Sequence, residues 1–205
     1  MLAVVDYGQG NVGSVVNLFR KAGARAELSG DPVELRAARA LVLPGVGAFD
    51  TCMHALRASG LIPFLEERVL GAQVPLLGIC VGMQMLTGGS DEGELPGLGW
   101  VAGRTRRLGV PVGTELRLPH MGWNRVIPRR PGGLFAGMED LARFYFVHSY
   151  RVECDDPADI SGEADYGGPF TAAIERGSLC AVQFHPEKSH RFGQRLAANF
   201  LAFAA

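Results

Sequence analysis

The feature that most constrains the fold is a cysteine between two glycines, Gly78-Ile79-Cys80-Val81-Gly82, at the end of an apolar run. Residues 74–79 predict a short buried strand, and the residues from Val81 onward can start a helix. A G-x-C-x-G sequence at such a junction is the thiol form of the nucleophile elbow, a strained turn that needs glycines on either side. The turn sets the sulfur over a helix N-terminus, which favours the thiolate. The alternative is a packed core cysteine, because free cysteines are often buried.

A second motif, His185-Pro186-Glu187-Lys188, follows the strand-like run Leu179–Phe184. Pro186 biases His185 toward an extended conformation and cannot continue a ladder, so the histidine should lie at a strand end. Glu187 is close enough to orient the imidazole and to stabilise the imidazolium, which is the logic of a catalytic triad. Without the elbow, a surface turn would be the simpler interpretation. Together the motifs predict a Cys80, His185 and Glu187 triad.

The composition is that of an ordinary globular domain. A chain of 205 residues with 47% hydrophobic and 20% charged residues is most simply one domain, residues 1–205. A net charge of −1 argues against binding to nucleic acid or to a membrane surface. No apolar stretch approaches the ~20 residues of a membrane helix, and no basic leader precedes the first strand.

The cysteines are scattered along the chain. Their spacing forms no C-x-x-C pair and no zinc pattern, so we expect no metal, a reducing cytoplasm and a single reactive thiol; they are Cys52, Cys80, Cys154 and Cys180.

The first half of the chain alternates strand-like and helix-like segments. Strands are expected at Leu2–Val5, Ala24–Leu28 and Ala40–Leu43. Helices are expected at Val12–Ala22, from Pro32 with Asp31 as its cap, at Ala48–Ala58 and at Ile62–Val69. Alternation of this kind predicts an α/β fold, with a parallel sheet and helices on both of its faces.

The pattern changes between Gly99 and Phe184. Short strands are expected there, broken by Gly, Pro and Asp, at Leu116–Leu118, Arg125–Ile127, Arg143–Val152, Ile160–Ala164 and Phe170–Ile174. They predict an antiparallel or mixed extension of the sheet. The basic run at residues 104–107 is interpreted as a solvated turn. The chain ends in a predicted helix, Arg191–Phe203.

Two glycine loops follow predicted strands. Ligand sites in open α/β sheets lie at the carboxyl ends of strands, where the loop Pro44–Gly47 and Cys80 should meet. An oxyanion hole there would use the N–H of Val81 and one from Val46 or Gly47. An ordinary glycine turn is the alternative. The other loop, residues 6–11, lacks the third glycine of the dinucleotide fingerprint, and we expect no cofactor.

These motifs resemble the class I (triad) glutamine amidotransferases. The sequences PGVGAF at 44–49, PHMGWN at 119–124 and FYFVHSY at 144–150 narrow the resemblance to the glutaminase subunits of imidazole glycerol phosphate synthase. It runs essentially from end to end of the chain. It implies a flavodoxin-like sheet and hydrolysis of glutamine through a thioester on Cys80, without a cofactor.

The resemblance also implies a substrate site and a partner. The α-amino and α-carboxylate groups of glutamine would be held by Gly47, Gln84, Glu92, Ser149 and Tyr150. Gly88-Gly89 departs from the family pattern and should loosen the segment that carries Glu92. A (β/α)₈-barrel cyclase subunit would form a heterodimer with this chain and receive its ammonia, with Asn11, Met121, Trp123 and Lys188 at the interface. For Trp123, burial in the core is the alternative.

Other functions are weighed against specific residues. A glutaminase for another synthase, such as anthranilate synthase, would not be expected to carry the sequence at 119–124. A cysteine-elbow peptidase or chaperone would lack His-Pro-Glu after the last strand. A catalytically inactive binding subunit is disfavoured because all three triad positions are filled.

Overall fold

The computed structural model describes residues 1–138 and 142–205, and its centre is the predicted parallel sheet. Five parallel strands stand in the order β2-β1-β3-β4-β12. They are β1 (Leu2–Val5), β2 (Ala26–Ser29), β3 (Ala40–Gly45), β4 (Leu76–Cys80) and β12 (Leu179–Val182). Strands β1, β3, β4 and β12 are buried along their whole length, as expected where both faces of a parallel sheet are covered.

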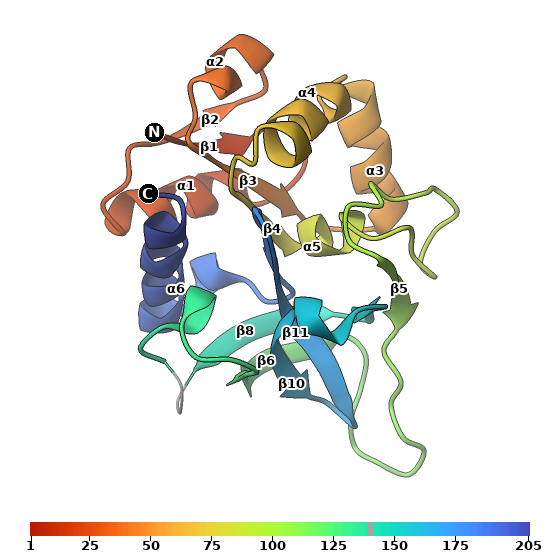
Figure 1. Cartoon of the computed structure of the whole chain (residues 1–205). Coiled ribbons are helices and arrows are strands. Elements are labelled where there is room, and N and C mark those ends of the chain that lie inside the picture. Colours follow the sequence, from red (N-terminus) through yellow and green to blue (C-terminus); the bar gives the residue numbers. More distant parts are fainter. Residues whose placement is uncertain (139–141) are drawn as a thin grey trace.

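Helices cover both faces of this sheet, so the predicted α/β class is confirmed (Figure 1). Helices α1 (Val12–Lys21) and α6 (His190–Phe203) lie on one side of β4. On the other side lie α3 (Phe49–Ala58), α4 (Ile62–Glu66) with a following π-helical turn at Glu67–Gly71, and α5 (Val81–Met85). Helix α2 (Pro32–Arg36) begins after Asp31, whose side chain accepts a hydrogen bond from the Val33 N–H at 2.8 Å, as the sequence predicts.

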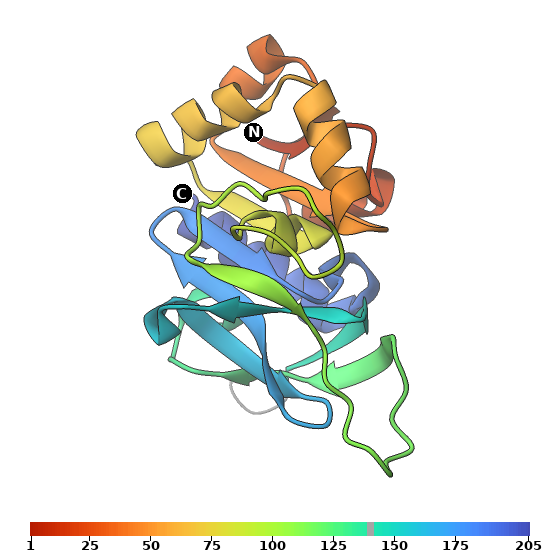
Figure 2. The same cartoon turned by 90° about the vertical axis from the view of Figure 1, so that its right-hand side faces the viewer.

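The second half of the chain extends the sheet with antiparallel strands, also as predicted. Strand β12 pairs with β11 (Pro169–Arg176), and β11 pairs in turn with β10 (Ile160–Asp165) and β9 (Tyr150–Cys154). Strands β7 (Ile127–Pro128) and β5 (Gly103–Arg107) lie at the edges, and β6 (His120–Arg125) forms a separate two-stranded sheet with β8 (Arg143–His148). Figure 2 shows these strands at the end of the molecule away from α2, α3 and α4.

Four sequence-based expectations in this half are wrong. Leu116–Leu118 is not a strand but part of the loop between β5 and β6, where the backbone N–H and C=O of Arg117 bond to the Tyr166 hydroxyl. The basic run at 104–107 belongs to β5 and not to a turn: its backbone pairs with β9, and only Thr105 points into the core. The run Arg143–Val152 is broken at Ser149, because β8 pairs with β6 whereas β9 pairs with β5 and β11. The run Arg125–Ile127 is likewise divided between β6 and β7.

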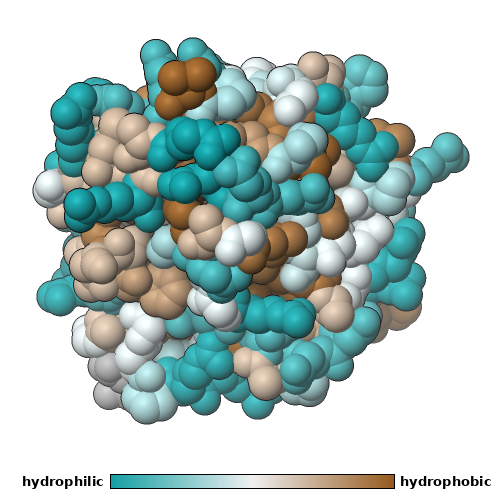
Figure 3. All heavy atoms as spheres, turned by 45° about the horizontal axis from the view of Figure 1, so that its top comes forward, coloured by the Kyte–Doolittle hydropathy of each residue, from teal (hydrophilic) through white to brown (hydrophobic). Residues whose placement is uncertain are grey.

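The surface carries no broad apolar face in the view of Figure 3, where hydrophobic residues form small patches separated by hydrophilic ones. Within the described part of the chain, none of the helices combines the length and the hydrophobicity that a membrane span requires.

Candidate active site

Cys80 lies on a strained turn between β4 and α5. Its φ angle is 56°, which is unusual for a residue with a side chain. The flanking glycines permit this turn because α5 passes directly over β3 and β4. A Cβ on Gly78 would lie 2.9 Å from the carbonyl oxygen of Gly82, and a Cβ on Gly82 would overlap the carbonyl oxygen of Leu43. The expectation that the two glycines relieve crowding at an elbow is therefore confirmed.

His185 and Glu187 form a buried pair beside the elbow. His185 follows β12 in an extended conformation, and its backbone N–H donates to the Tyr145 carbonyl at 2.9 Å. Its Nδ1 lies 2.8 Å from Oε1 of Glu187, and the side chains of the pair are only 3% and 1% exposed. Burial lowers the pKa of His185, but interactions with Cys80 and Glu187 outweigh this effect and raise the pKa to about 10. An imidazolium is therefore favoured next to the sulfur at neutral pH.

The other three cysteines are held as neutral thiols. Burial raises the pKa of Cys52 and of Cys180, and it raises that of Cys154 to about 12. None of them lies on a turn with positive φ. Cys80 is thus the cysteine with the surroundings of a nucleophile.

A cavity of about 490 Å³ opens in front of the sulfur. Ten residues that the sequence singled out line it: Val46, Gly47, Cys80, Val81, Gln84, Glu92, Ser149, Tyr150, His185 and Lys188. Glu187 lies behind His185 and borders a second, smaller cavity. Sequence reasoning did not place four further lining residues there: Arg107, Pro119, Val147 and His148. The cavity is large enough for a free amino acid, and its walls carry charges of both signs.

Two buried donors hold the loop Pro44–Gly47 beside the cavity. The Tyr7 hydroxyl donates to the Pro44 carbonyl at 2.6 Å, and the Cys52 thiol donates to the Val46 carbonyl at 3.3 Å. Burial raises the pKa of Tyr7 far above its usual range, so this donor keeps its proton. In a trans peptide the N–H points away from the C=O, so the N–H of Gly47 is directed away from Cys52.

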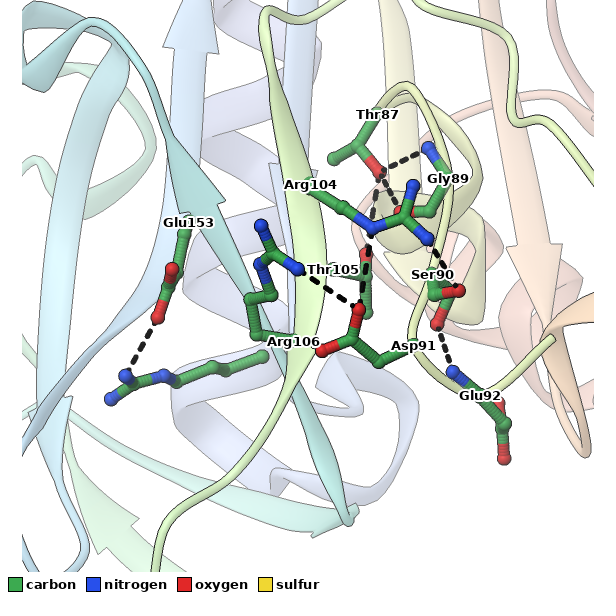
Figure 4. A network of polar contacts seen from close by, with 10 residues as sticks. Thr87, Gly89, Ser90, Asp91, Glu92, Arg104, Thr105, Arg106 and Glu153 are labelled. Carbon is green, nitrogen blue, oxygen red and sulfur yellow. Dashed lines mark hydrogen bonds and ion pairs between the residues drawn. The ribbon is translucent and has the colours of Figure 1, made fainter. Parts of the chain in front are cut away.

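The segment that carries Glu92 is tied to its surroundings, contrary to the expectation that Gly88-Gly89 loosens it. Glu92 Oε2 accepts a hydrogen bond from the Phe49 N–H at 2.9 Å, at the positive end of α3. Figure 4 shows the rest of the network: Asp91 Oδ1 lies 3.3 Å from Arg104 and 3.1 Å from Arg106, both on β5. These contacts offset the conformational freedom of the glycines.

The carbonyl of Tyr150 is fixed by side chains from two other elements. It accepts from His148 Nδ1 at 2.8 Å and from Gln84 Nε2 at 3.3 Å. His148 Nε2 in turn lies 2.9 Å from His120 Nδ1. Burial lowers the pKa of His120 to about 4 and that of His148 to about 3, so both rings are neutral at pH 7. His120 lies in the sequence motif at 119–124 and His148 in the motif at 144–150, but only the pairing register of β6 and β8 brings the two histidines together.

Two of the predicted interface residues lie on an exposed stretch of β6. Met121 is 61% exposed and Trp123 is 40% exposed, so the alternative of a core tryptophan is wrong. Trp123 stacks on His190 with ring centres 5.5 Å apart, and Lys188 Nζ lies 5.7 Å from the centre of the Tyr145 ring. Asn11 lies at the start of α1, outside the cavity.

Known proteins resemble this chain over its whole length. The family model for glutamine amidotransferase class-I matches residues 3–203. The imidazole glycerol phosphate synthase subunit HisH of Bdellovibrio bacteriovorus is 48% identical over 201 residues, and subunit HisH 2 of Pseudomonas aeruginosa is 45% identical over 201 residues; each alignment covers 98% of both chains.

Solved structures show the same fold. A crystal structure of glutamine amidotransferase aligns with a TM-score of 0.73 at 21% identity, over 99% of this chain and 98% of that chain. The glutaminase domain of CTPS from Trypanosoma brucei, with bound acivicin, aligns with a TM-score of 0.66 at 18% identity, over 99% of this chain and 92% of that chain. The chain therefore belongs to the class-I glutamine amidotransferase family of enzymes, among the relatives of imidazole glycerol phosphate synthase subunit HisH.

Proposed function

We propose that the chain hydrolyses glutamine to glutamate and ammonia through a thioester on Cys80. The thiolate attacks the side-chain amide carbon, and His185 gives its proton to the departing nitrogen, which leaves as ammonia. His185 then takes a proton from water, whose oxygen displaces the sulfur and releases glutamate. Glu187 keeps Nδ1 of His185 occupied, so that the other ring nitrogen serves the reaction. The buried 2.8 Å contact between His185 and Glu187, beside a cysteine at φ 56°, is the observation that carries this proposal.

The charge that develops on the amide oxygen needs hydrogen-bond donors. We assign this role to the N–H of Val81, the first residue of α5, and to an N–H of the loop at Val46 or Gly47. Both segments line the cavity beside Cys80. Any reorganisation that turns the Val46 carbonyl must break its hydrogen bond with Cys52. The loop is therefore the element on which a partner could act.

The remaining lining residues suit a zwitterionic amino acid. Glu92 supplies a carboxylate for the α-ammonium group, and the hydrogen bond from the Phe49 N–H holds that carboxylate in place. Ser149 and Tyr150 offer hydroxyl and backbone groups for the α-carboxylate, with Gly47 nearby. Gln84 also lines the cavity, and its NH₂ group serves this site indirectly, because it donates to the Tyr150 carbonyl and to Gln183. A small, highly polar substrate needs several such contacts, because each buried polar group must find a partner.

The partner we propose is a (β/α)₈-barrel cyclase that uses the ammonia to make imidazole glycerol phosphate, in a heterodimer working in the cytoplasm. Relatives of this chain carry names that make them subunits of that synthase. Ammonia must pass between subunits without meeting bulk water, because ammonium is not a nucleophile. The docking face should therefore adjoin the cavity, where Lys188 lies at the rim and Met121 and Trp123 are exposed nearby.

Replacement of the nucleophile tests the proposed reaction. Cys80→Ala should abolish glutamine hydrolysis by the assembled synthase and leave synthesis from added ammonia intact. A diazoketone analogue of glutamine should label Cys80 in the wild-type chain. Cys154→Ala is the matched control and should retain full activity. Labelling of a different cysteine, with activity lost in step, would contradict the assignment.

We further propose that the ligand-bound cyclase activates glutamine hydrolysis by reorganising the loop Pro44–Gly47. The isolated chain should hydrolyse glutamine very slowly, and the ligand-bound cyclase should raise the rate by orders of magnitude. A chain that works at full speed by itself would refute the gating and leave the triad intact.

A further inference from the structure

A second group contacts the sulfur of Cys80, from the side chain of Gln183. This residue follows β12, two positions before His185, and it is fully buried. Its Nε2 lies 3.8 Å from Sγ of Cys80, within the longer range of hydrogen bonds to sulfur. Its Oε1 accepts from Gln84 Nε2 at 3.1 Å. Gln183 therefore lies between the nucleophile and the network behind the substrate cavity.

The direction of this amide is set by the network and is not free. A backbone carbonyl can only accept, so Gln84 must present its NH₂ group to the Tyr150 carbonyl. The same NH₂ group faces Gln183, which must therefore present its oxygen there. The NH₂ group of Gln183 is then left for the sulfur. A flipped amide would set its oxygen against the thiolate and its NH₂ group against that of Gln84.

The neutral histidine pair forms a second row of hydrogen bonds that ends on the Tyr150 carbonyl, and its donors and acceptors are fixed in the same way. His148 Nδ1 must carry a proton to donate to that carbonyl, so its Nε2 accepts from His120 Nδ1. His120 Nε2 is then an acceptor and faces Nδ2 of Asn124 at 3.3 Å. Asn124 is fixed in turn, because Nδ2 also donates to the Asp165 carbonyl at 2.8 Å. The carbonyls of Tyr150 and Asp165, at the two ends of this row of hydrogen bonds, thus determine which group donates and which accepts at each contact.

We propose that Gln183 is a positioning residue for the nucleophile, which donates an amide N–H to the Cys80 thiolate in the orientation that the Tyr150 carbonyl imposes through Gln84. This inference rests on the proposed role of Cys80. The donor stabilises the charged form of sulfur and holds it at the mouth of the cavity, alongside the contribution of His185. It also places the thiolate and the Tyr150 backbone in one hydrogen-bonded unit, so that nucleophile and substrate loop keep a common geometry.

The test measures the reactivity of Cys80 in the full chain as a function of pH. Alkylation by iodoacetamide, quantified on the Cys80 peptide by mass spectrometry, gives a pH midpoint for the thiolate, and absorbance at 240 nm gives a second value. Gln183→Met removes the donor without adding charge, and it should raise the midpoint by about one pH unit, because a hydrogen bond to a charged group is worth at least that much. Gln84→Met should shift the midpoint in the same direction by less, because the Gln183 amide remains but loses its orientation.

The titratable groups around the sulfur do not change in these variants. His185 stays in place, and Tyr7 and Cys52 remain neutral. Thr87→Val is the matched control. It removes a buried hydroxyl just after α5 that contacts the Gln84 carbonyl, the backbone of Gly89 and the Thr105 hydroxyl, and not the sulfur. Its midpoint should equal that of the wild type.

Each outcome decides the inference. An unchanged midpoint in folded Gln183→Met, or an equal shift in Thr87→Val, would overturn the positioning role. If Gln183→Met does not fold, Gln84→Met decides the question by the same criterion. Failure of Cys80 to react at any pH, with another cysteine modified in its place, would instead refute the proposed function.

Discussion

The buried His120–His148 pair should make the fold sensitive to mild acid. Both rings are neutral in the folded protein, with pKa values of about 4 and about 3, whereas an unfolded histidine titrates near 6.5. For a base whose folded pKa is lowered, the unfolded state binds more protons as the pH falls below 6.5, so stability decreases from there toward the folded pKa values. Protonation of His148 would also set two donors against each other across the 2.9 Å contact, and protonation of His120 would do the same at the 3.3 Å contact with Asn124 Nδ2.

The size of the effect follows from the linkage relation. Between pH 7 and pH 5, each histidine with these pKa values removes about 2 kcal/mol, or about 3–4 kcal/mol for the pair. That is a large part of the 5–15 kcal/mol that typically separates folded and unfolded states. His185 acts in the opposite direction, because its raised pKa stabilises the fold below about pH 10, but it adds back only about 1 kcal/mol over this interval.

Urea unfolding at pH 7 and pH 5, at constant ionic strength, measures the difference. The double variant His120→Gln/His148→Gln keeps His185, so subtracting its pH dependence from that of the wild type isolates the pair. We expect the wild type to lose about 3–4 kcal/mol more than the variant. Equal losses in the two proteins would refute the reasoning. So would proton NMR resonances of the two rings that titrate near pH 6.5 in the folded wild type.

Three further predictions concern the elbow and the site. His185→Ala should reduce glutamine hydrolysis by the assembled enzyme about 10²–10⁴-fold, with Glu187→Gln less damaging, because only the first removes the proton carrier; steady-state kcat values showing the reverse order would require a different triad. Gly82→Ala should destabilise the fold by on the order of 3 kcal/mol in chemical unfolding, because the added Cβ overlaps the Leu43 carbonyl. Gly13→Ala in α1 is the control and should not destabilise the fold, because a Cβ there meets no atom within 4 Å. Equal effects of the two substitutions would argue against close packing at the elbow. Glu92→Gln should raise the KM for glutamine more than it lowers kcat, because it removes the charge assigned to the α-ammonium group; a change confined to kcat would remove Glu92 from that role.

The sequence predicts the first half of the fold well because its signals are local. Each parallel strand is a short apolar run, each helix repeats its apolar positions, and Asp31 caps α2 through a contact two residues away. The elbow is also local: five residues specify a strand end, a strained cysteine and the start of α5. His185 and Glu187 are two positions apart, so their pairing could be inferred without knowledge of the sheet.

The second half depends on partners far away in the chain. Strand β5 contains three arginines and reads as a turn, yet its backbone pairs with β9 some 45 residues later, roughly ten times the span of a hairpin loop. The run at residues 143–152 is divided at Ser149 because β8 and β9 pair with different strands. No local pattern carries that information, since strand propensity reflects the neighbours that cover each face.

The direction of the hydrogen bonds at the sulfur is likewise a tertiary property. Residue types alone give Gln84, Gln183 and His148 both donor and acceptor groups, so each could face either way. Their orientation becomes unique only when the fold places the Tyr150 carbonyl between His148 and Gln84. The sequence by itself predicts Cys80 as the nucleophile, with His185 and Glu187 beside it, because each of the two motifs is local. Only the tertiary structure decided which buried groups contact the sulfur of Cys80 and in which orientation, because the Tyr150 carbonyl can only accept hydrogen bonds and so fixes the amide of Gln84 and, through it, that of Gln183.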